Sequence, residues 1–185
     1  TNILGSAAFN QLFMDNVRIP RANLVGEVNR GWYVGATTLD FERSSIGSAV
    51  GLKLQLDGLV KYAKAHEKDG TSRTGYLGTV KMDLADRYVE AGVARLMSYR
   101  VITMQAKVLI PNHEASMTKL FASELSQRIS RTGMKVLGLH GQLWGDTAPL
   151  RGRYESSYMT SLSSTIAGGT SEIQRNIIAT RGLGL

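Results

Sequence analysis

The sequence lacks cysteine and long apolar runs, and both absences exclude whole classes of structure. With no cysteine among 185 residues, neither a disulfide framework nor a thiolate metal site can form. No apolar run approaches the roughly 20 residues that a membrane-spanning helix needs. Residues 1–10 lack the basic and then apolar pattern of a signal peptide. The sequence therefore predicts a cytoplasmic protein that is not attached to a membrane.

Histidine is also scarce. His66, His113 and His140 have no metal-ligand spacing, and no carboxylates are arranged around them as a site. We therefore expect no bound metal.

The net charge is +7, with a sequence pI of about 9.8, so a nucleic-acid partner has to be considered. The lysines and arginines are scattered, however, and neither a basic block nor a nucleic-acid-binding motif accompanies them. This distribution favours a solvated surface or a small anionic ligand over nucleic acid.

Proline occurs only at Pro20, Pro111 and Pro149, which leaves room for long helices between them. Three stretches carry apolar residues at the three- and four-residue steps typical of a helix with one apolar face. They are marked by Leu52, Leu56, Leu59, Val60 and Ala63; by Met82, Ala85, Val89, Val93 and Leu96; and by Phe121, Leu125, Ile129 and Val136.

The first residues follow a different pattern. Apolar residues take nearly every second position across 9–20, which predicts a strand followed by an extended turn. One or two strands do not form an independent sheet, so residues 1–29 are interpreted as the remnant of a β-domain and its linker. Residues 30–185 are expected to form one helical domain. The predicted fold is all-α, an up-down bundle of the four-helix type with a short N-terminal β tail.

Two segments could carry chemistry. In the first, Asp40 and Arg43 share one helix face, and Glu42 points about 200° away from Asp40. The spacing alone favours a charged patch on a solvated face. In the second, Gly168 and Gly169 lead into a helix beginning near Ser171, where Ser171 and Gln174 match a capping box. Such a turn either presents backbone N–H groups to an anion or carbonyl oxygen, or is an ordinary loop.

These segments occur in the order found in one family. Residues 13–27 (FMDNVRIPRANLVGE), 39–43 (LDFER), 84–86 (LAD) and 168–175 (GGTSEIQR) together resemble the C-terminal part of the acyl-CoA dehydrogenases. The resemblance covers nearly the whole chain. It implies an FAD enzyme that removes an α-proton and a β-hydride from an acyl-CoA thioester, giving a 2-enoyl-CoA. Electrons would pass to an electron-transfer flavoprotein, from a tetramer built largely through this helical domain.

The resemblance also assigns the base. Most members carry a glutamate before the Gly-Thr of the terminal motif, where this sequence has Gly168. A subset, including the isovaleryl- and long-chain-specific enzymes, carries the base on the first bundle helix, at the position of Glu42. The glycine at 168 therefore strengthens the assignment of Glu42 as the catalytic base.

Further roles follow from the same resemblance. It implies that Asp40, Phe41 and Arg43 lie along the acyl-CoA site, although Phe41 could equally be a packing residue. It also implies that Gly168 and Gly169 contact the substrate. The family positions that touch flavin are those of Thr170, Ser171 and Glu172.

Two family motifs are altered. The usual R-x-x-F-G is His66-Glu67-Lys68-Asp69-Gly70, and the usual Q-x-x-G-G-x-G begins at Lys135 and includes Gly138. In the family, the first of these motifs contacts the flavin of a neighbouring subunit, so the resemblance implies that this chain's contacts to a neighbour's flavin are depleted. This pattern resembles heteromeric bacterial dehydrogenases of the actinobacterial type, including those acting on steroid side chains. It leaves open a non-catalytic or half-site subunit of such an assembly. Without its other domains, the 185-residue chain is expected to be inactive.

Overall fold

A computed structural model describes residues 1–7, 9–42, 46–66 and 78–185, with only the backbone described for 39–42, 46 and 47. Its α-helices are α1 (Gly31–Glu42), α2 (Ile46–Ala65), α3 (Gly78–Ala106), α4 (His113–Leu137), α5 (Arg153–Ser164) and α6 (Ser171–Ile177). Shorter helical segments are η1 (Arg21–Asn23), η3 (Gly138–Gln142), η4 (Pro149–Gly152) and the π-helical η5 (Ile178–Leu183).

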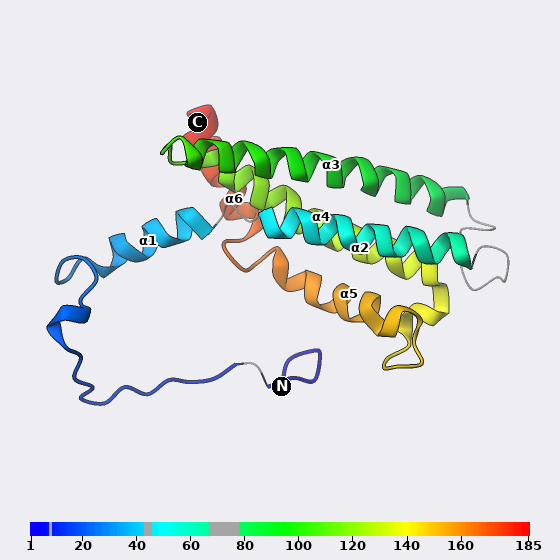
Figure 1. The fold of residues 1–185 in the computed structure, drawn as a ribbon, viewed down its shortest axis with the longest axis horizontal. Coiled ribbons are helices and arrows are strands. Elements are labelled where there is room, and N and C mark those ends of the chain that lie inside the picture. Colours follow the sequence, from blue (N-terminus) through cyan, green and yellow to red (C-terminus); the bar gives the residue numbers. More distant parts are fainter. Residues whose placement is uncertain (8, 43–45, 67–77) are drawn as a thin grey trace.

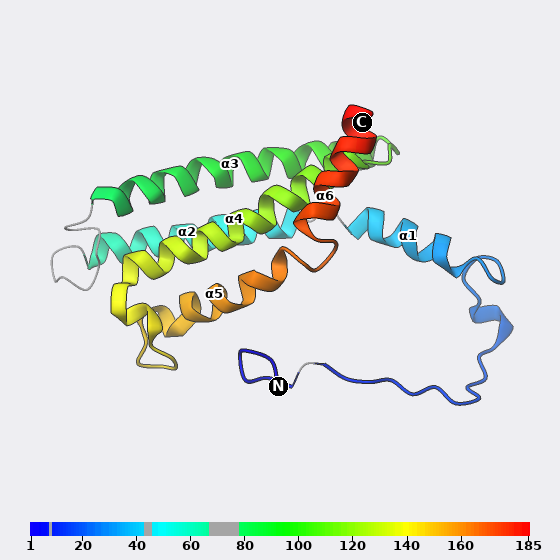
Figure 2. The ribbon, with the colours of Figure 1, turned by 180° about the vertical axis from the view of Figure 1, so that it is seen from behind.

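Helices α2 to α5 run up, down, up and down, which confirms the predicted bundle (Figure 1). Helix α4 is the central element, because it packs against α2, α3, α5 and α6. Figure 2 shows the other side, where α6 leaves the end of the bundle at which α4 begins. Within the described residues, no helix is both long and apolar enough to cross a membrane.

The apolar faces of α2 and α4 form the core, as their spacing predicts. Leu56, Leu59, Leu125, Ile129 and Val136 are fully buried. Full burial of one such side chain contributes about 1.5–3 kcal/mol to stability, so these five alone hold α2 against α4 strongly. Most of this stabilisation comes from packing between helices and not from helix propensity.

Helix α3 differs from its sequence pattern. It faces α2 and α4 with small residues such as Ala91, Ala94 and Ser98, which allow close approach. The apolar row that marks the helix in the sequence points outward instead. The exposed members of this α3 stripe are Met82, Ala85, Val89, Val93 and Leu96.

Tyr154 attaches α5 to the rest of the bundle. Its ring is buried, and its hydroxyl donates a hydrogen bond to the backbone oxygen of Gln55 in α2 at 2.6 Å. Burial raises the pKa of this hydroxyl far above its usual range, so it remains a neutral donor. The ring lies against Gly133 of α4, where a Cβ would collide with it.

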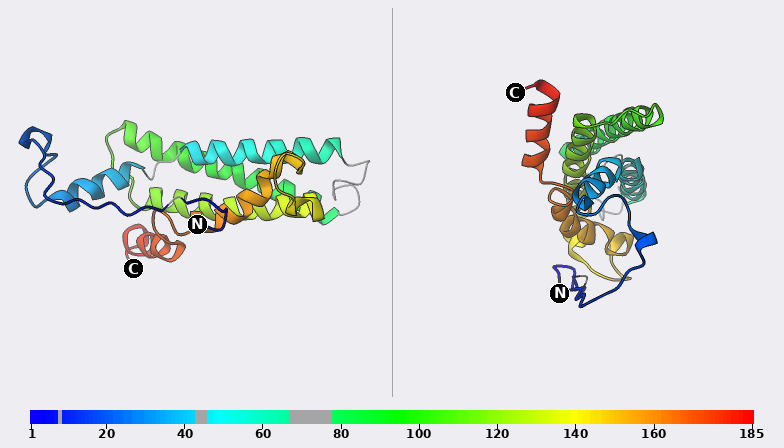
Figure 3. Two further views of the ribbon diagram at one scale, coloured as in Figure 1. Left: turned by 90° about the horizontal axis from the view of Figure 1, so that it is seen from below. Right: turned by 90° about the vertical axis from the view of Figure 1, so that its left-hand side faces the viewer.

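The strand predicted within residues 9–20 does not form, since the described part of this segment contains no strand. A strand needs a partner for its backbone N–H and C=O groups, and none is provided by the rest of the described chain. The apolar side chains of Phe9, Leu12, Phe13 and Val17 are exposed accordingly. In Figure 1 the segment passes outside the bundle, and α1 lies beyond the bundle's end (Figures 1 and 3).

Candidate active site

A cavity of about 730 Å³ opens between α2, α4 and the loop from α5 to α6. Most of its wall consists of glycine, alanine and serine, so few side chains fill it. The lining residues are Ser48, Gly51, Leu52, Gln55, Lys119, Ala122, Ser123, Ser126, Ser164, Ala167, Gly168, Gly169, Ile173 and Gln174.

The Gly168–Gly169 turn forms one rim of this cavity. Both residues have positive φ, +69° and +100°, which glycine adopts without strain. Only Gly169 also lacks space for a side chain, because a Cβ there would lie 2.5 Å from Nε2 of Gln174. At Gly168 the nearest atom to a Cβ would be Cε of Lys119, at an ordinary 3.8 Å. A side chain would therefore fit at 168 and not at 169.

Helix α6 begins at Ser171, as predicted, but its cap lies one residue earlier than the predicted capping box. The Thr170 side chain accepts a hydrogen bond from the backbone N–H of Ile173 at 3.2 Å. Gln174 does not complete a box. It is fully buried, and its Nε2 donates to the backbone oxygen of Gly168 at 2.9 Å.

The first turn of α6 carries the exposed carboxylate of Glu172. Its own backbone N–H, and then the Thr170 hydroxyl, hydrogen-bond the carboxylate and lower its pKa, with Arg175 adding to the effect. Glu172 is therefore ionised and its position is constrained beside the turn.

Helix α4 holds the loop through a polar row of Lys119, Ser123 and Gln127, spaced four residues apart. Nζ of Lys119 donates to the backbone oxygen of Gly169 at 2.5 Å. The backbone oxygen of Ser123 accepts from the Ser164 hydroxyl at 3.3 Å, and Nε2 of Gln127 donates to Oγ1 of Thr165 at 3.0 Å. These contacts could not be predicted from the sequence, because they join residues far apart in the chain.

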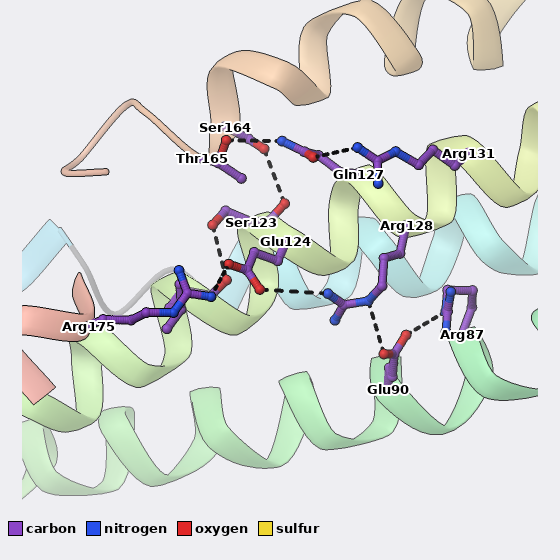
Figure 4. A network of polar contacts seen from close by, with 11 residues as sticks. Arg87, Glu90, Ser123, Glu124, Gln127, Arg128, Arg131, Ser164, Thr165 and Arg175 are labelled. Atoms are coloured by element: carbon purple, nitrogen blue, oxygen red, sulfur yellow. Dashed lines mark hydrogen bonds and ion pairs between the residues drawn. The ribbon is translucent and has the colours of Figure 1, made fainter. Parts of the chain in front are cut away.

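A second row on α4 is charged and connects three helices (Figure 4). Arg175 of α6 lies 2.7 Å from Glu124, and Arg128 bridges Glu124 at 3.9 Å and Glu90 of α3 at 3.0 Å. Arg87 also pairs with Glu90. Because neighbouring members share partners, the row constrains α6 relative to α4 and α3.

The structure places the predicted site residues in three groups. Asp40, Phe41 and Glu42 form the last turn of α1, with only their backbone described, and Arg43 lies outside the described residues. Gly168 and Gly169 form the cavity rim, followed directly by Thr170, Ser171 and Glu172. Ser171 is buried, which leaves Thr170 and Glu172 as the accessible groups of this set.

The third group lies at the opposite end of the bundle. His66 follows the end of α2, where its ring stacks on Tyr62 with centroids 4.2 Å apart. Residues 67–70 of the same motif lie outside the described residues. Lys135 pairs with Asp83 at 2.7 Å, and Gly138, at φ +58°, ends α4. Lys135 lies 16 residues, or about 24 Å, along α4 from Lys119, whose side chain binds the turn, so this group is well separated from the turn.

Comparison with known proteins agrees with this architecture. Residues 29–183 match the family model described as "Acyl-CoA dehydrogenase, C-terminal domain". The chain belongs to the acyl-CoA dehydrogenase family. The match covers all the described helices of the bundle and the cavity between them, so this domain is the part of the family's architecture that the chain contains.

Three relatives illustrate the similarity. Acyl-CoA dehydrogenase FadE26 of Mycobacterium tuberculosis is 33% identical over 94% of this chain and 44% of its own length. The mitochondrial short-chain specific acyl-CoA dehydrogenase of Rattus norvegicus is 34% identical, covering 96% and 42%. The solved structure named Tcur3481-Tcur3483 steroid ACAD superposes with a TM-score of 0.80 at 27% identity, covering 94% of this chain and 44% of that one. The chain thus spans less than half the length of these relatives.

Proposed function

We propose that this chain is the C-terminal domain of an FAD-dependent acyl-CoA dehydrogenase that converts an acyl-CoA thioester to a 2-enoyl-CoA, with Glu42 as base. The observation that carries the proposal is that the rim of the cavity has no ionisable side chain at position 168. The position that usually bears the family's glutamate is Gly168, which has no side chain to take a proton. A carboxylate from elsewhere is needed, and Glu42 stands at the family's alternative position.

Chain connectivity supports this assignment. Glu42 precedes Ser48 of the cavity wall by six residues, so their Cα atoms lie within about 21 Å even for a fully extended chain. The α1–α2 connection therefore limits the distance between Glu42 and the cavity wall at Ser48. We propose that Asp40, Phe41 and Arg43 line the acyl-CoA channel beside it, and that Gly168 and Gly169 contact the thioester end.

The chemistry assigned to the chain is a proton transfer. The Glu42 carboxylate takes the α-proton, and the electron pair of the α C–H bond becomes the π bond of the new C=C. The electron pair of the β C–H bond leaves with the hydride. A partly desolvated carboxylate has a raised pKa and a greater affinity for that proton. The flavin, when bound, supplies the acceptor for the hydride and passes electrons on to an electron-transfer flavoprotein.

The accessible residues after the turn fit a flavin. Glu172 offers an ionised, exposed acceptor, and it adjoins Ile173 of the cavity wall. FAD carries ribityl and ring N–H donors that such a carboxylate would bind. We propose that Thr170, Ser171 and Glu172 serve the flavin of their own subunit, with Ser171 acting through the backbone geometry because it is buried.

The group at the far end would serve a second flavin. Lys135 and Gly138 lie about 24–29 Å along α4 from Lys119, which binds the turn, and His66 lies at the same end of the bundle. This separation fits the resemblance, in which these positions face the flavin of a neighbouring subunit. We propose a homo- or hetero-tetramer built through the helical domain, and the exposed α3 stripe provides an apolar surface for such contacts.

The alternative is a non-catalytic or half-site subunit of a heteromeric dehydrogenase. The altered neighbour-facing motifs favour it, and the name of the solved relative, Tcur3481-Tcur3483, joins two designations. We do not assign the acyl group of the substrate, because one similar relative is named for short-chain substrates and another is named a steroid ACAD.

The test uses the full-length protein, purified alone and with any partner that accompanies it. We expect formation of 2-enoyl-CoA from a panel of short-chain, branched and steroid-bearing acyl-CoA thioesters, with an artificial electron acceptor. Flavin content per chain distinguishes the assemblies, since one FAD per chain in a homotetramer would exclude the half-site alternative. No enoyl-CoA from any substrate, with flavin bound, would contradict the catalytic proposal.

A further inference from the structure

The Gly168–Gly169 turn is held by two side chains that the family resemblance does not mark. Its two carbonyl oxygens are bonded separately, that of Gly168 to Nε2 of Gln174 and that of Gly169 to Nζ of Lys119. Each bond fixes one peptide plane, because the carbonyl and the following N–H of a trans peptide are rigidly opposed. Two bonds thus determine the orientation of both peptide units at the cavity rim.

The turn needs such restraint. Two consecutive glycines allow far more backbone conformations than any other pair, and both residues adopt positive φ here. Because both residues are glycine, the loop has no side chain at 168 or 169 that could pack against the bundle. Without outside bonds, the rim of the cavity would sample several geometries.

Both side chains also carry a cost in folding free energy. The ammonium of Lys119 is half-buried, and loss of hydration lowers its pKa although Glu124 acts in the opposite direction. Gln174 is fully buried, and its Oε1 has no hydrogen-bond partner among the described residues. Placing a partly dehydrated charge and a half-satisfied amide at the same turn costs folding free energy.

We infer that Lys119 is a positioning residue, which together with Gln174 orients the Gly168–Gly169 turn against the reacting end of the substrate. This inference rests on the proposed function, because it requires that the turn contacts the thioester. Lys119 acts through the backbone oxygen of Gly169. It is suited to this role because a charged donor forms a stronger hydrogen bond to a carbonyl than a neutral one does.

The test compares Lys119→Met and Lys119→Arg in the full-length holoenzyme, with its partner if one accompanies it. Methionine keeps the length of the side chain and removes the donor, whereas arginine retains a charged donor. Lys53→Met is the matched control, because Lys53 also forms a short ion pair, with Asp57 on the exposed side of α2. The readouts are kcat, KM, flavin content and the melting temperature.

We expect Lys119→Met to lower kcat by about 10- to 100-fold, as a displacement of about 1 Å at a reacting group does. Its melting temperature and flavin content should equal or exceed those of the wild type. Lys119→Arg should recover most of the loss, and Lys53→Met should match the wild type. Gln174→Met, which removes the second bond, should lower kcat in the same direction.

Three results would overturn the inference: a Lys119→Met enzyme within twofold of wild-type kcat, a parallel fall of activity and melting temperature, or no recovery with arginine. An inactive wild-type holoenzyme would instead remove the proposed function and this inference with it. The two failures are therefore distinguishable by the wild-type rate alone.

Discussion

The two adjacent glycines of the turn have different reasons to be glycine. Gly168 has a φ of +69° but open space around a Cβ, whereas Gly169 has a φ of +100° and no space. A side chain at 168 would therefore meet backbone strain alone, whereas at 169 it would meet both strain and a close contact. Lack of space therefore distinguishes Gly169 from Gly168.

Alanine substitutions test this difference. Gly168→Ala should cost about 1–2 kcal/mol, the strain of a left-handed L-residue. Gly169→Ala should cost about 3 kcal/mol or more, because it adds displacement of the buried Gln174 amide to backbone strain. Urea unfolding of both variants measures the two free energies. Equal losses would show that the space at 168 and 169 is not what distinguishes them.

Among the elements, α4 organises the molecule. One face buries Leu125, Ile129 and Val136 in the core, and two polar rows beside it hold the α5–α6 loop and connect α3 with α6. The Gly168–Gly169 turn is therefore positioned by α4 together with Gln174 of α6. A loop held in this way can present glycine-rich backbone without losing a defined geometry.

The contact of α5 with α4 depends on the absence of a side chain at Gly133. We predict that Gly133→Ala destabilises the protein by about 3 kcal/mol, since its Cβ would overlap the buried Tyr154 ring. Gly58→Ala is the control, because it also lies inside a helix and its Cβ would meet open space. That change should stabilise by about 0.4–1 kcal/mol. Thermal unfolding of both variants checks the pair, and a stable Gly133→Ala protein would contradict the packing described here.

Much of the fold follows from periodicity, and the exceptions have physical causes. The stripes of α2 and α4 predict the core because their large apolar residues have no other surface to cover. The stripe of α3 misleads, since the helix uses Ala91, Ala94 and Ser98 inward and exposes Val89 and Leu96. The strand expected within 9–20 finds no partner strand among the described residues.

The candidate site was predictable only in part. Glycines 168 and 169 stand out in the sequence, but the roles of Lys119 and Gln174 depend on side chains meeting backbone oxygens 50 and 6 residues away. Such contacts follow from the packing of α4 and α6 and leave no local motif. The cap at Thr170 shows the same limit, because Ser171 fits a capping box equally well by spacing.

For the whole molecule, the exposed apolar surface indicates association. Met82, Val89 and Leu96 repeat every seven residues along α3 and are each about two-thirds exposed, at 66%, 68% and 64%. A row of this kind is typical of a helix that packs against another subunit or domain.

We predict that the double change Val89→Glu and Leu96→Glu reduces the oligomeric state of the full-length protein, because burying two carboxylates in an apolar contact costs several kcal/mol. Sedimentation velocity measures the assembly. The control is Leu54→Glu, an exposed leucine of α2 at 65% exposure, which should leave the assembly intact. An unchanged sedimentation coefficient for the α3 variant would show that this surface is not an interface.

Exchange of the substrate's α-proton tests the assignment of Glu42 as the base most directly. The full-length wild type, Glu42→Gln and the control Glu27→Gln are each incubated with an acyl-CoA substrate in heavy water, and deuterium at the α-carbon is followed by mass spectrometry. Loss of the general base should slow the exchange by at least about 10²–10⁴-fold in Glu42→Gln, with an unchanged melting temperature, and leave Glu27→Gln at the wild-type rate. Exchange at the wild-type rate in Glu42→Gln would contradict the assignment of the base and favour a non-catalytic subunit.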